Sequence, residues 1–197
     1  NIATDTWIQR ANFLGGARRE AVGFSVGSKG YIGTGTTSGT FLGDFYEYDP
    51  ATDTWTQKPD LPGSPRREAI GFSIGSKGYI TCGRTQGNRV PYAMLNDFWQ
   101  FDPSTDQWIE LQSLCSGVRE GIGFSIGNKG YLGIGNPAAQ GPASSNIFWE
   151  YNPTVTGIGE MNNENFFSIY PNPSSGLFTV TSQEKITAIE IYNVLGE

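Results

Sequence analysis

Arginine and glutamate recur together three times along the chain, and these are the residue types best suited to recognition. Guanidinium groups bind carboxylates through paired, charge-assisted hydrogen bonds. The groups therefore predict either ion pairs between structural repeats or a surface that binds a ligand. Val118 replaces the first arginine of the third group. The residues are Arg18, Arg19 and Glu20, then Arg66, Arg67 and Glu68, and finally Arg119 and Glu120.

The residue types of the chain offer little support for a catalytic site. The chain has no histidine, which excludes Ser-His-Asp and Cys-His catalysis and histidine-based copper or zinc sites from this stretch. A glycine-rich run at 33–39 (GTGTTSG) has no helix after it, so it does not predict a phosphate-binding loop. The carboxylates at 44, 47, 97, 102 and 150 fit structural roles better than a glycosidase pair. We predict no cofactor and no metal.

Three loops form a second candidate binding surface. Residues 34–43, 84–96 and 135–146 differ in length and sequence, while the segments around them repeat. Function commonly resides in variable loops carried by a rigid scaffold. The middle loop offers contact groups that suit a ligand, although loops without any partner are an equal alternative. Its candidate ligand-binding residues are Arg84, Arg89 and Tyr92.

The elements that position these residues follow from an internal repeat of about 50 residues. Self-similarity at such a period indicates a repeat architecture. In the middle copy, 68–75, 79–82, 97–101 and 107–111 read as four strands that turns connect. Such a thin antiparallel sheet must stack against its neighbours, as the blades of a propeller do. We expect recurring aromatic residues to pack between blades, namely Trp7, Trp55, Trp108, Phe24, Phe72 and Phe124.

The repeat resembles the kelch motif of bacterial surface proteins. Each copy has arginine, then G-F-S-[IV]-G-x-K-G-Y, a glycine-rich strand end, an aromatic strand with Asp-Pro or Asn-Pro, and in the first two copies a tryptophan. The resemblance implies an all-β fold, a partial β-propeller of about three four-stranded blades. Kelch propellers usually have six or seven blades, and arginines at this place face the channel and bind acidic peptides or sugars.

The expected organisation is three blades at about 18–58, 66–112 and 119–153, within a kelch region of 1–157. Residues 1–10 would be an outer strand of a preceding or closing blade. Three blades cannot close a ring, since propellers have about four to eight. We therefore expect a fragment of a longer protein, with an obligate oligomer as the alternative.

The sequence changes character after Pro153. Residues 158–165 read as a linker, and 166–197 resemble the type A C-terminal sorting domain of the type IX secretion system of Bacteroidetes, here truncated. The resemblance implies the start of a small Ig-like β-sandwich that the export machinery reads. The alternative is an ordinary accessory domain. The sorting motif comprises Tyr170, Pro171, Asn172, Pro173 and Gly176.

Charge and cysteine usage complete the sequence predictions. The net charge of −6 disfavours nucleic acid as a partner, because no basic stripe could neutralise phosphates. The sequence shows no signal peptide and no apolar run long enough for a transmembrane segment. Cys82 and Cys115 should end on the same face, so a disulfide is allowed, and two buried thiols are the alternative.

These observations favour a secreted or cell-surface kelch propeller that acts as a glycan- or protein-binding module. It would pass through the periplasm and reach the outer surface through its tail. One alternative is a carbohydrate-active enzyme of the galactose-oxidase-like or sialate-mutarotase-like kelch type. Another is a purely structural adhesion component.

Overall fold

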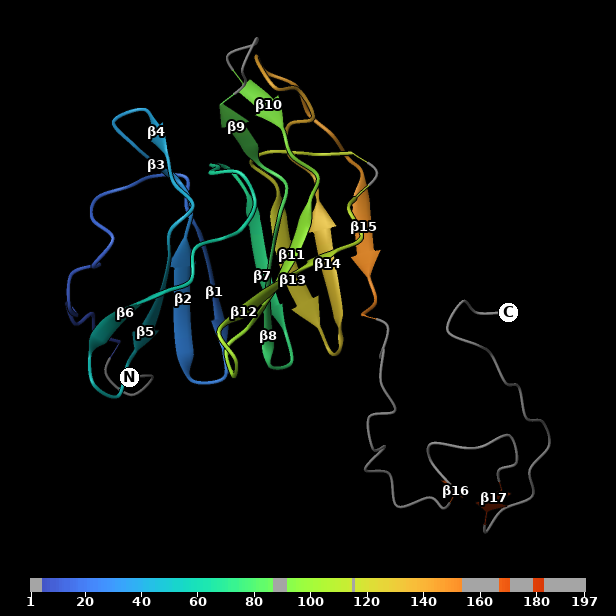
Figure 1. The fold of residues 1–197 in the computed structure, drawn as a ribbon. Coiled ribbons are helices and arrows are strands. Elements are labelled where there is room, and N and C mark those ends of the chain that lie inside the picture. The colour runs from blue at the N-terminus through green and yellow to red at the C-terminus, as the bar shows by residue number, and fades with distance from the viewer. Residues whose placement is uncertain (1–4, 87–91, 115, 154–166, 171–178, 183–197) are drawn as a thin grey trace. The chain divides into compact units, whose positions relative to one another are not determined.

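The computed structural model describes residues 5–86, 92–114, 116–153, 167–170 and 179–182. The chain divides into two compact units, Asn1–Pro153 and Thr154–Glu197. Every regular element in the described residues is a β-strand (Figure 1). The predicted all-β fold class is therefore confirmed. None of these residues forms a helix that could cross a membrane.

The described residues of the first unit form three antiparallel sheets of three or four strands, which we call blades 1, 2 and 3. Their strand orders are β1-β2-β5-β6, β7-β8-β11-β12 and β13-β14-β15. The innermost strands β1, β7 and β13 lie side by side, so the blades follow one another in chain order (Figure 1). Blade 1 comprises β1 (Val22–Val26), β2 (Lys29–Gly33), β5 (Phe45–Asp49) and β6 (Thr54–Lys58). Blade 2 comprises β7 (Ile70–Ile74), β8 (Lys77–Thr81), β11 (Phe98–Asp102) and β12 (Gln107–Leu111), and blade 3 comprises β13 (Ile122–Ile126), β14 (Lys129–Gly133) and β15 (Phe148–Tyr151).

The inner hairpin of each blade turns over two residues. In blade 1, Val26 pairs with Lys29, so Gly27 and Ser28 form the connection. Gly27 has a φ of 58°, a conformation that glycine adopts without steric cost and that two-residue hairpin turns require. In blade 2 the turn is shorter than predicted, because sequence analysis left residues 76–78 between two strands, but Lys77 already pairs with Ile74 in the sheet.

Two short hairpins extend the loops between the second and third strands. Blade 1 carries β3 (Thr36–Thr37) and β4 (Thr40–Phe41), and blade 2 carries β9 (Arg84–Gln86) and β10 (Tyr92–Met94). Sequence analysis predicted irregular loops at these positions. Isolated bridges from Arg19 to Thr36 and from Arg67 to Arg84 join each hairpin to the segment that enters its own blade.

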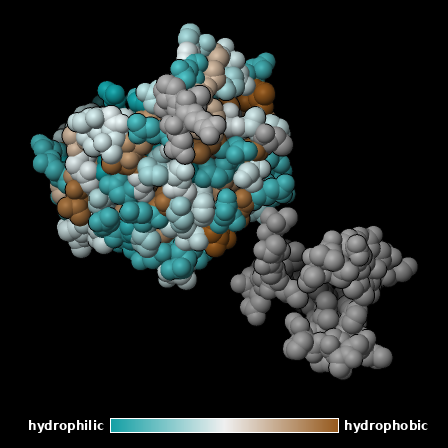
Figure 2. Space-filling view, turned by 45° about the horizontal axis from the view of Figure 1, so that its top comes forward, coloured by the Kyte–Doolittle hydropathy of each residue, from teal (hydrophilic) through white to brown (hydrophobic). Residues whose placement is uncertain are grey.

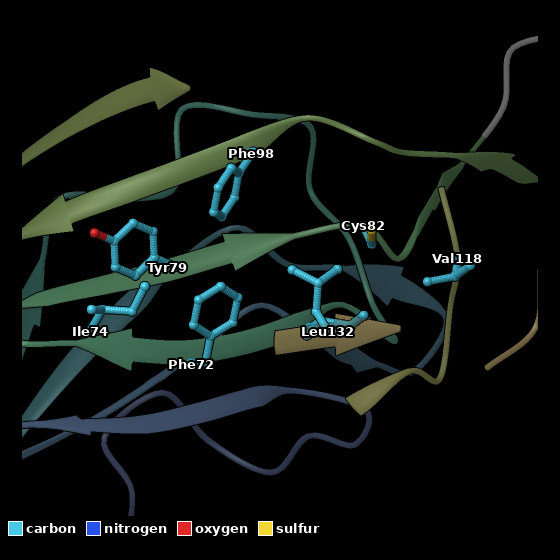
Figure 3. Packing of buried hydrophobic residues seen from close by; sticks show 8 residues of the cluster. Phe72, Ile74, Tyr79, Cys82, Phe98, Val118 and Leu132 are labelled. Atoms are coloured by element: carbon cyan, nitrogen blue, oxygen red, sulfur yellow. The ribbon is translucent and has the colours of Figure 1, made fainter. Parts of the chain in front are cut away.

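Apolar side chains fill the two junctions between blades. Phe72 and Ile74 of blade 2 share a cluster with Leu132 of blade 3 (Figure 3). Its other members are Ile70, Tyr79, Cys82, Phe98 and Val118. Phe101 of blade 2 closes the other junction against Tyr31 and Phe45 of blade 1, as inter-blade packing predicts. Cys82 is a free, fully buried thiol, and Cys115 lies outside the described residues, so the disulfide stays untested.

Two of the six aromatic residues depart from the predicted packing. Trp7 is fully exposed, and residues 5–10 form no strand. Phe124 is 39% exposed, because it lies on a face of blade 3 that no other described blade covers. Trp55 and Trp108 are partly buried, and Phe72 is buried. Figure 2 shows the hydrophobic residues as separate brown patches on a largely hydrophilic surface.

The second unit has one described pair of strands. β16 (Phe167–Tyr170) runs antiparallel to β17 (Thr179–Ser182). Pro171, Asn172, Pro173 and Gly176 of the predicted sorting motif lie outside the described residues, as does the predicted linker. The exact linker boundaries stay a prediction.

Candidate functional site

The first arginine of each RRE group lies inside its own blade. Arg18 donates two hydrogen bonds to Asp44, at 2.6 and 2.7 Å. Arg66 does the same to Asp97, at 2.6 and 2.5 Å, and its side chain is fully buried. Neither guanidinium is available to a ligand in this arrangement, so both leave the predicted ligand-binding set.

The two aspartates are held in their charged form. Burial alone would raise the pKa of Asp97, but the hydrogen bonds and positive charge of Arg66 lower this pKa below its ordinary value. The pKa of Asp44 is lowered in the same way by Arg18. In blade 3, Val118 replaces the arginine, and Ile147 stands where the aspartate would be. Both halves of the buried ion pair are therefore absent together from this blade.

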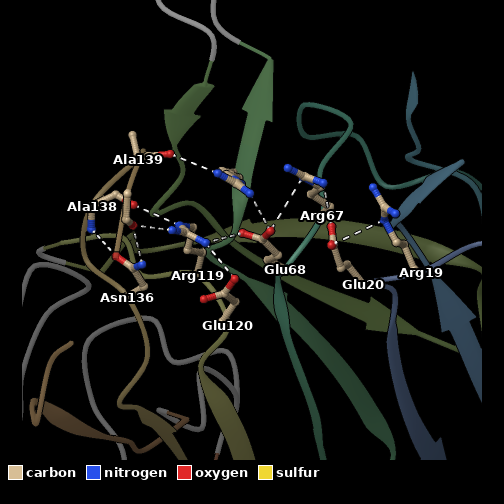
Figure 4. A network of polar contacts seen from close by, with 11 residues as sticks. Arg19, Glu20, Arg67, Glu68, Arg119, Glu120, Asn136, Ala138 and Ala139 are labelled. Atoms are coloured by element: carbon tan, nitrogen blue, oxygen red, sulfur yellow. Dashed lines mark hydrogen bonds and ion pairs between the residues drawn. The ribbon is translucent and has the colours of Figure 1, made fainter. Parts of the chain in front are cut away.

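The arginine that precedes the glutamate forms an ion pair across a blade junction in the second and third groups, whereas Arg19 of the first group pairs with Glu20 of its own segment. Arg67 of blade 2 donates to Glu20 of blade 1 at 2.9 Å, and Arg119 of blade 3 donates to Glu68 of blade 2 at 3.1 Å (Figure 4). We call this row the Arg–Glu ladder; it comprises Arg19, Glu20, Arg67, Glu68, Arg84, Arg119 and Glu120. The inter-blade pairing that sequence analysis gave as the alternative is present at both junctions.

Glu68 is the centre of the Arg–Glu ladder. Its carboxylate accepts hydrogen bonds from Arg84 at 2.7 Å and from Arg119 at 3.1 Å, and its side chain is buried. Arg119 also donates to Glu120 and to the backbone oxygens of Ala138 and Gly141 (Figure 4). The loop of blade 3 therefore accepts two of the four hydrogen bonds that the Arg119 guanidinium donates. Sequence analysis named Glu68 only as an ion-pair partner and gave no sign that two arginines share it.

The loop hairpins place aromatic rings over the ladder. Phe41 and Tyr92 stack with their centroids 5.9 Å apart and their planes within 3°. The Arg67 guanidinium lies 5.0 Å from the first ring and 5.3 Å from the second. Arg84 lies 4.3 Å from Tyr92. We call Phe41, Arg67, Arg84 and Tyr92 the guanidinium–aromatic cluster; such contacts restrain the charged groups.

Two donors of the cluster make no hydrogen bond to a described residue. The Nε atoms of Arg67 and Arg84 are buried and lack a hydrogen-bond partner there, although Arg67 Nε lies 3.7 Å from a carboxylate oxygen of Glu68. Arg19 adds an exposed guanidinium that is 72% accessible and only loosely paired with Glu20, at 3.5 Å. Arg89 lies outside the described residues. Of the predicted ligand-binding residues, the structure thus brings Arg67, Arg84, Arg119 and Tyr92 together and leaves Arg19 at the open end.

Backbone strain accompanies the ladder. Glu20, Glu68 and Glu120 have φ values of 59°, 58° and 58°, a region that non-glycine residues rarely adopt. The same positive-φ conformation recurs at the ends of the second strands, in Thr34, Cys82 and Ile134, with φ values of 60°, 61° and 56°. Strained backbone at equivalent places in all three blades indicates a geometry that surrounding contacts impose.

A surface depression and the acidic residues give weaker evidence of a binding site than the ladder does. A depression of about 400 Å³ lies between blades 1 and 2 at the hairpin turns, and Gly27, Gly75 and Asp102 are among its lining residues. It is at the opposite end of the strands from the ladder, and Lys77 already pairs with Asp102. Within the described residues, no cluster of three or more histidine, cysteine, aspartate or glutamate residues could hold a metal.

Comparisons with known proteins agree with this architecture. A model of the kelch motif matches residues 30–62, and a model of the secretion system C-terminal sorting domain matches residues 168–197. No curated protein matches the chain. The solved structure titled "Structure of YjhT" is 22% identical, has a TM-score of 0.55, and aligns over 66% of this chain and 37% of its own. This chain thus spans much less than the full length of that protein.

The sorting domain indicates export to the cell surface or the extracellular space. It also implies the type IX export machinery as a partner.

Proposed function

We propose that this exported kelch module binds an acidic ligand, with a carboxylated glycan as the first candidate, at the guanidinium–aromatic cluster and the neighbouring Arg19. The observation that carries the proposal is the pair of buried Nε donors on Arg67 and Arg84, which make no hydrogen bond within the described residues. A buried donor without a partner costs free energy, and a ligand oxygen would recover it.

Local charge supports an anionic ligand although the chain is acidic overall. The net charge of the chain is −6. The Arg–Glu ladder instead carries four arginines against three glutamates, and its only strongly exposed arginine is Arg19. Guanidinium groups offer carboxylates a planar set of donors that lysine lacks.

The test compares an oligogalacturonate with its methyl-esterified, uncharged counterpart by isothermal titration calorimetry. The acid should bind and the ester should not. Arg84→Lys keeps the positive charge near Glu68 but removes the planar donor set, so affinity should fall about tenfold or more. Arg10→Lys is the matched control, because Arg10 is exposed and lies outside the ladder.

A purely structural role of the ladder makes different predictions. The ion pairs across both junctions favour this second candidate. It predicts that neither oligosaccharide binds and that Arg84→Lys lowers only the melting temperature. Equal binding of the acid and the ester, or equal losses for Arg84→Lys and Arg10→Lys, would also contradict the proposed site.

A further inference from the structure

The loop of blade 3 is held in a different way from the loops of blades 1 and 2. In those two blades the chain between the second and third strands pairs with itself in the hairpins β3–β4 and β9–β10. The corresponding stretch of blade 3, residues 136–141, contains no strand. Within the described residues, its backbone pairs with other backbone at Asn136, which exchanges two hydrogen bonds of 2.8 and 3.0 Å with Arg119. We call residues 136–141 the strap.

Arginine side chains hold the rest of the strap. Arg119 donates from Nε to Ala138 O at 2.9 Å and from Nη2 to Gly141 O at 2.8 Å (Figure 4). Arg84 of blade 2 donates from Nη1 to Ala139 O at 3.2 Å. Three backbone oxygens of one short segment therefore accept hydrogen bonds from two arginines.

The donors of Arg119 that hold the strap have the arrangement that binds a carboxylate. Nε and Nη2 lie on one edge of the planar guanidinium, and such an edge can donate two parallel hydrogen bonds to the two oxygens of a carboxylate. Two neutral backbone oxygens take these bonds here. Glu68 and Glu120 both accept from the other terminal nitrogen, Nη1, so they leave this edge to the strap. The strap thus stands in for an anion at Arg119.

An anionic acceptor can compete with the strap for this edge. A carboxylate gains a Coulomb attraction to the guanidinium that a neutral carbonyl lacks. Besides the arginines, Asn136 keeps the strap in place, since it donates to Gly141 O and accepts from Ala138 N, both at 2.9 Å. Pro137, Ala138 and Ala139 belong to neither apolar cluster of the described residues. Within this part of the chain, little apolar burial opposes displacement of the strap.

We propose that the Nε–Nη2 edge of Arg119 is a second carboxylate subsite, which the strap covers until a ligand displaces it. The inference rests on the proposed function and extends it, because Arg84 belongs both to the guanidinium–aromatic cluster and to the strap contacts. One carboxylate of the ligand binds at the cluster and a second binds at Arg119. The ligand class is therefore an acidic polymer with repeated carboxylates, such as an oligogalacturonate, rather than a single uronic acid.

Hydrogen exchange measured by mass spectrometry follows the strap directly. Trigalacturonate added to the wild-type protein should speed the exchange of the amide hydrogens at 138–141, because the ligand displaces the strap. Monomeric galacturonate carries one carboxylate and should leave this exchange unchanged. Slower exchange with trigalacturonate would contradict the proposal, since it would mean that the strap closes over the ligand.

Gly141→Ala weakens the closed strap without changing an arginine. Gly141 has a φ of 75°, which is unfavourable for a residue with a side chain, and a Cβ built on it meets no atom of a described residue within 4 Å. Destabilising the closed form raises the open fraction, so the affinity for trigalacturonate should rise about fivefold in titration calorimetry. The affinity for monomeric galacturonate should stay the same. Asn136→Ala removes both side-chain hydrogen bonds of Asn136 and should act in the same direction.

Gly127→Ala is the matched control for Gly141→Ala. Gly127 also has a positive φ, 60°, and open space around a built Cβ, but it lies in the β13–β14 turn at the other end of the strands of blade 3. This variant should leave the affinity for both saccharides unchanged. Circular dichroism reports the folding of each variant.

The outcomes separate the second subsite from the proposed function. If trigalacturonate binds neither the wild type nor Gly141→Ala and Asn136→Ala, the proposed function fails and the subsite fails with it. If trigalacturonate binds the wild type without faster exchange in the strap, or without an affinity gain in either strap variant, only the second subsite is overturned. Binding to the strap variants alone would support both, with a strap that stays closed in the wild type.

Discussion

Replacing Arg66 by alanine should lower the free energy of unfolding by about 3–5 kcal/mol, because it leaves Asp97 partly buried without its partner. Arg66 is fully buried and donates two hydrogen bonds to Asp97 and a third to the backbone oxygen of Cys82. Urea unfolding monitored by tryptophan fluorescence measures the change. Arg19→Ala is the control, because this exposed side chain has one loose contact and should change stability by less than about 1 kcal/mol.

The pH dependence of this difference identifies the ion pair as its source. Arg66 holds the pKa of Asp97 below its unfolded value. The stabilisation is therefore fully present above the unfolded pKa and is lost as the pH falls through the folded pKa. The gap between wild type and Arg66→Ala should narrow below about pH 4. A gap that is constant down to acid pH would show that lost packing, rather than the ion pair, accounts for the effect.

Phe98→Ala should cost about 3–5 kcal/mol of stability, the usual loss for a buried aromatic side chain. Phe98 is only 3% exposed. It packs edge-on against Tyr151 of blade 3, with centroids 4.7 Å apart, and beside Phe72 and Tyr79 of its own blade. The substitution therefore opens a cavity in the junction between blades 2 and 3, which thermal or urea unfolding would detect.

Phe148→Ala is a matched control for this prediction. Phe148 is the equivalent residue of blade 3, because it pairs with the last residue of the second strand as Phe98 does, but it is 47% exposed. The loss of stability on its replacement should be about 1 kcal/mol. Equal losses at the two positions would mean that burial between blades does not stabilise this fold.

The separate behaviour of adjacent arginines matters for any ligand experiment. Substitution of Arg18 or Arg66 is expected to destabilise the blade rather than to report on binding, because both side chains pair with partly buried aspartates. Arg84 and Arg19 are better probes, since their donors lie at the ladder. A loss of binding is informative only if the melting temperature of the same variant is known.

The sequence alone determined the repeating part of this protein. Alternating apolar and polar residues, glycine-containing turns and Asp-Pro turns are local signals, and they place the four strands of the middle blade within a few residues. The recurrence of arginine and glutamate likewise indicated where charged groups would gather. The predicted lengths of the turns agree less well with the structure, because the lysine after Gly27-Ser28 is already paired in the sheet.

Only the tertiary structure decided which carboxylate each arginine pairs with. Arg66 and Arg67 are neighbours in an extended segment, so their side chains leave it in opposite directions. One meets Asp97 of its own blade and the other meets Glu20 of the preceding blade, 31 and 47 residues away in the chain. The exposure of Trp7 and Phe124 could not be predicted from the sequence either, since the pattern of a strand does not show whether another blade covers its side chains. Local propensity fixes a strand, but partners that are distant in sequence determine whether its side chains are buried, paired or free.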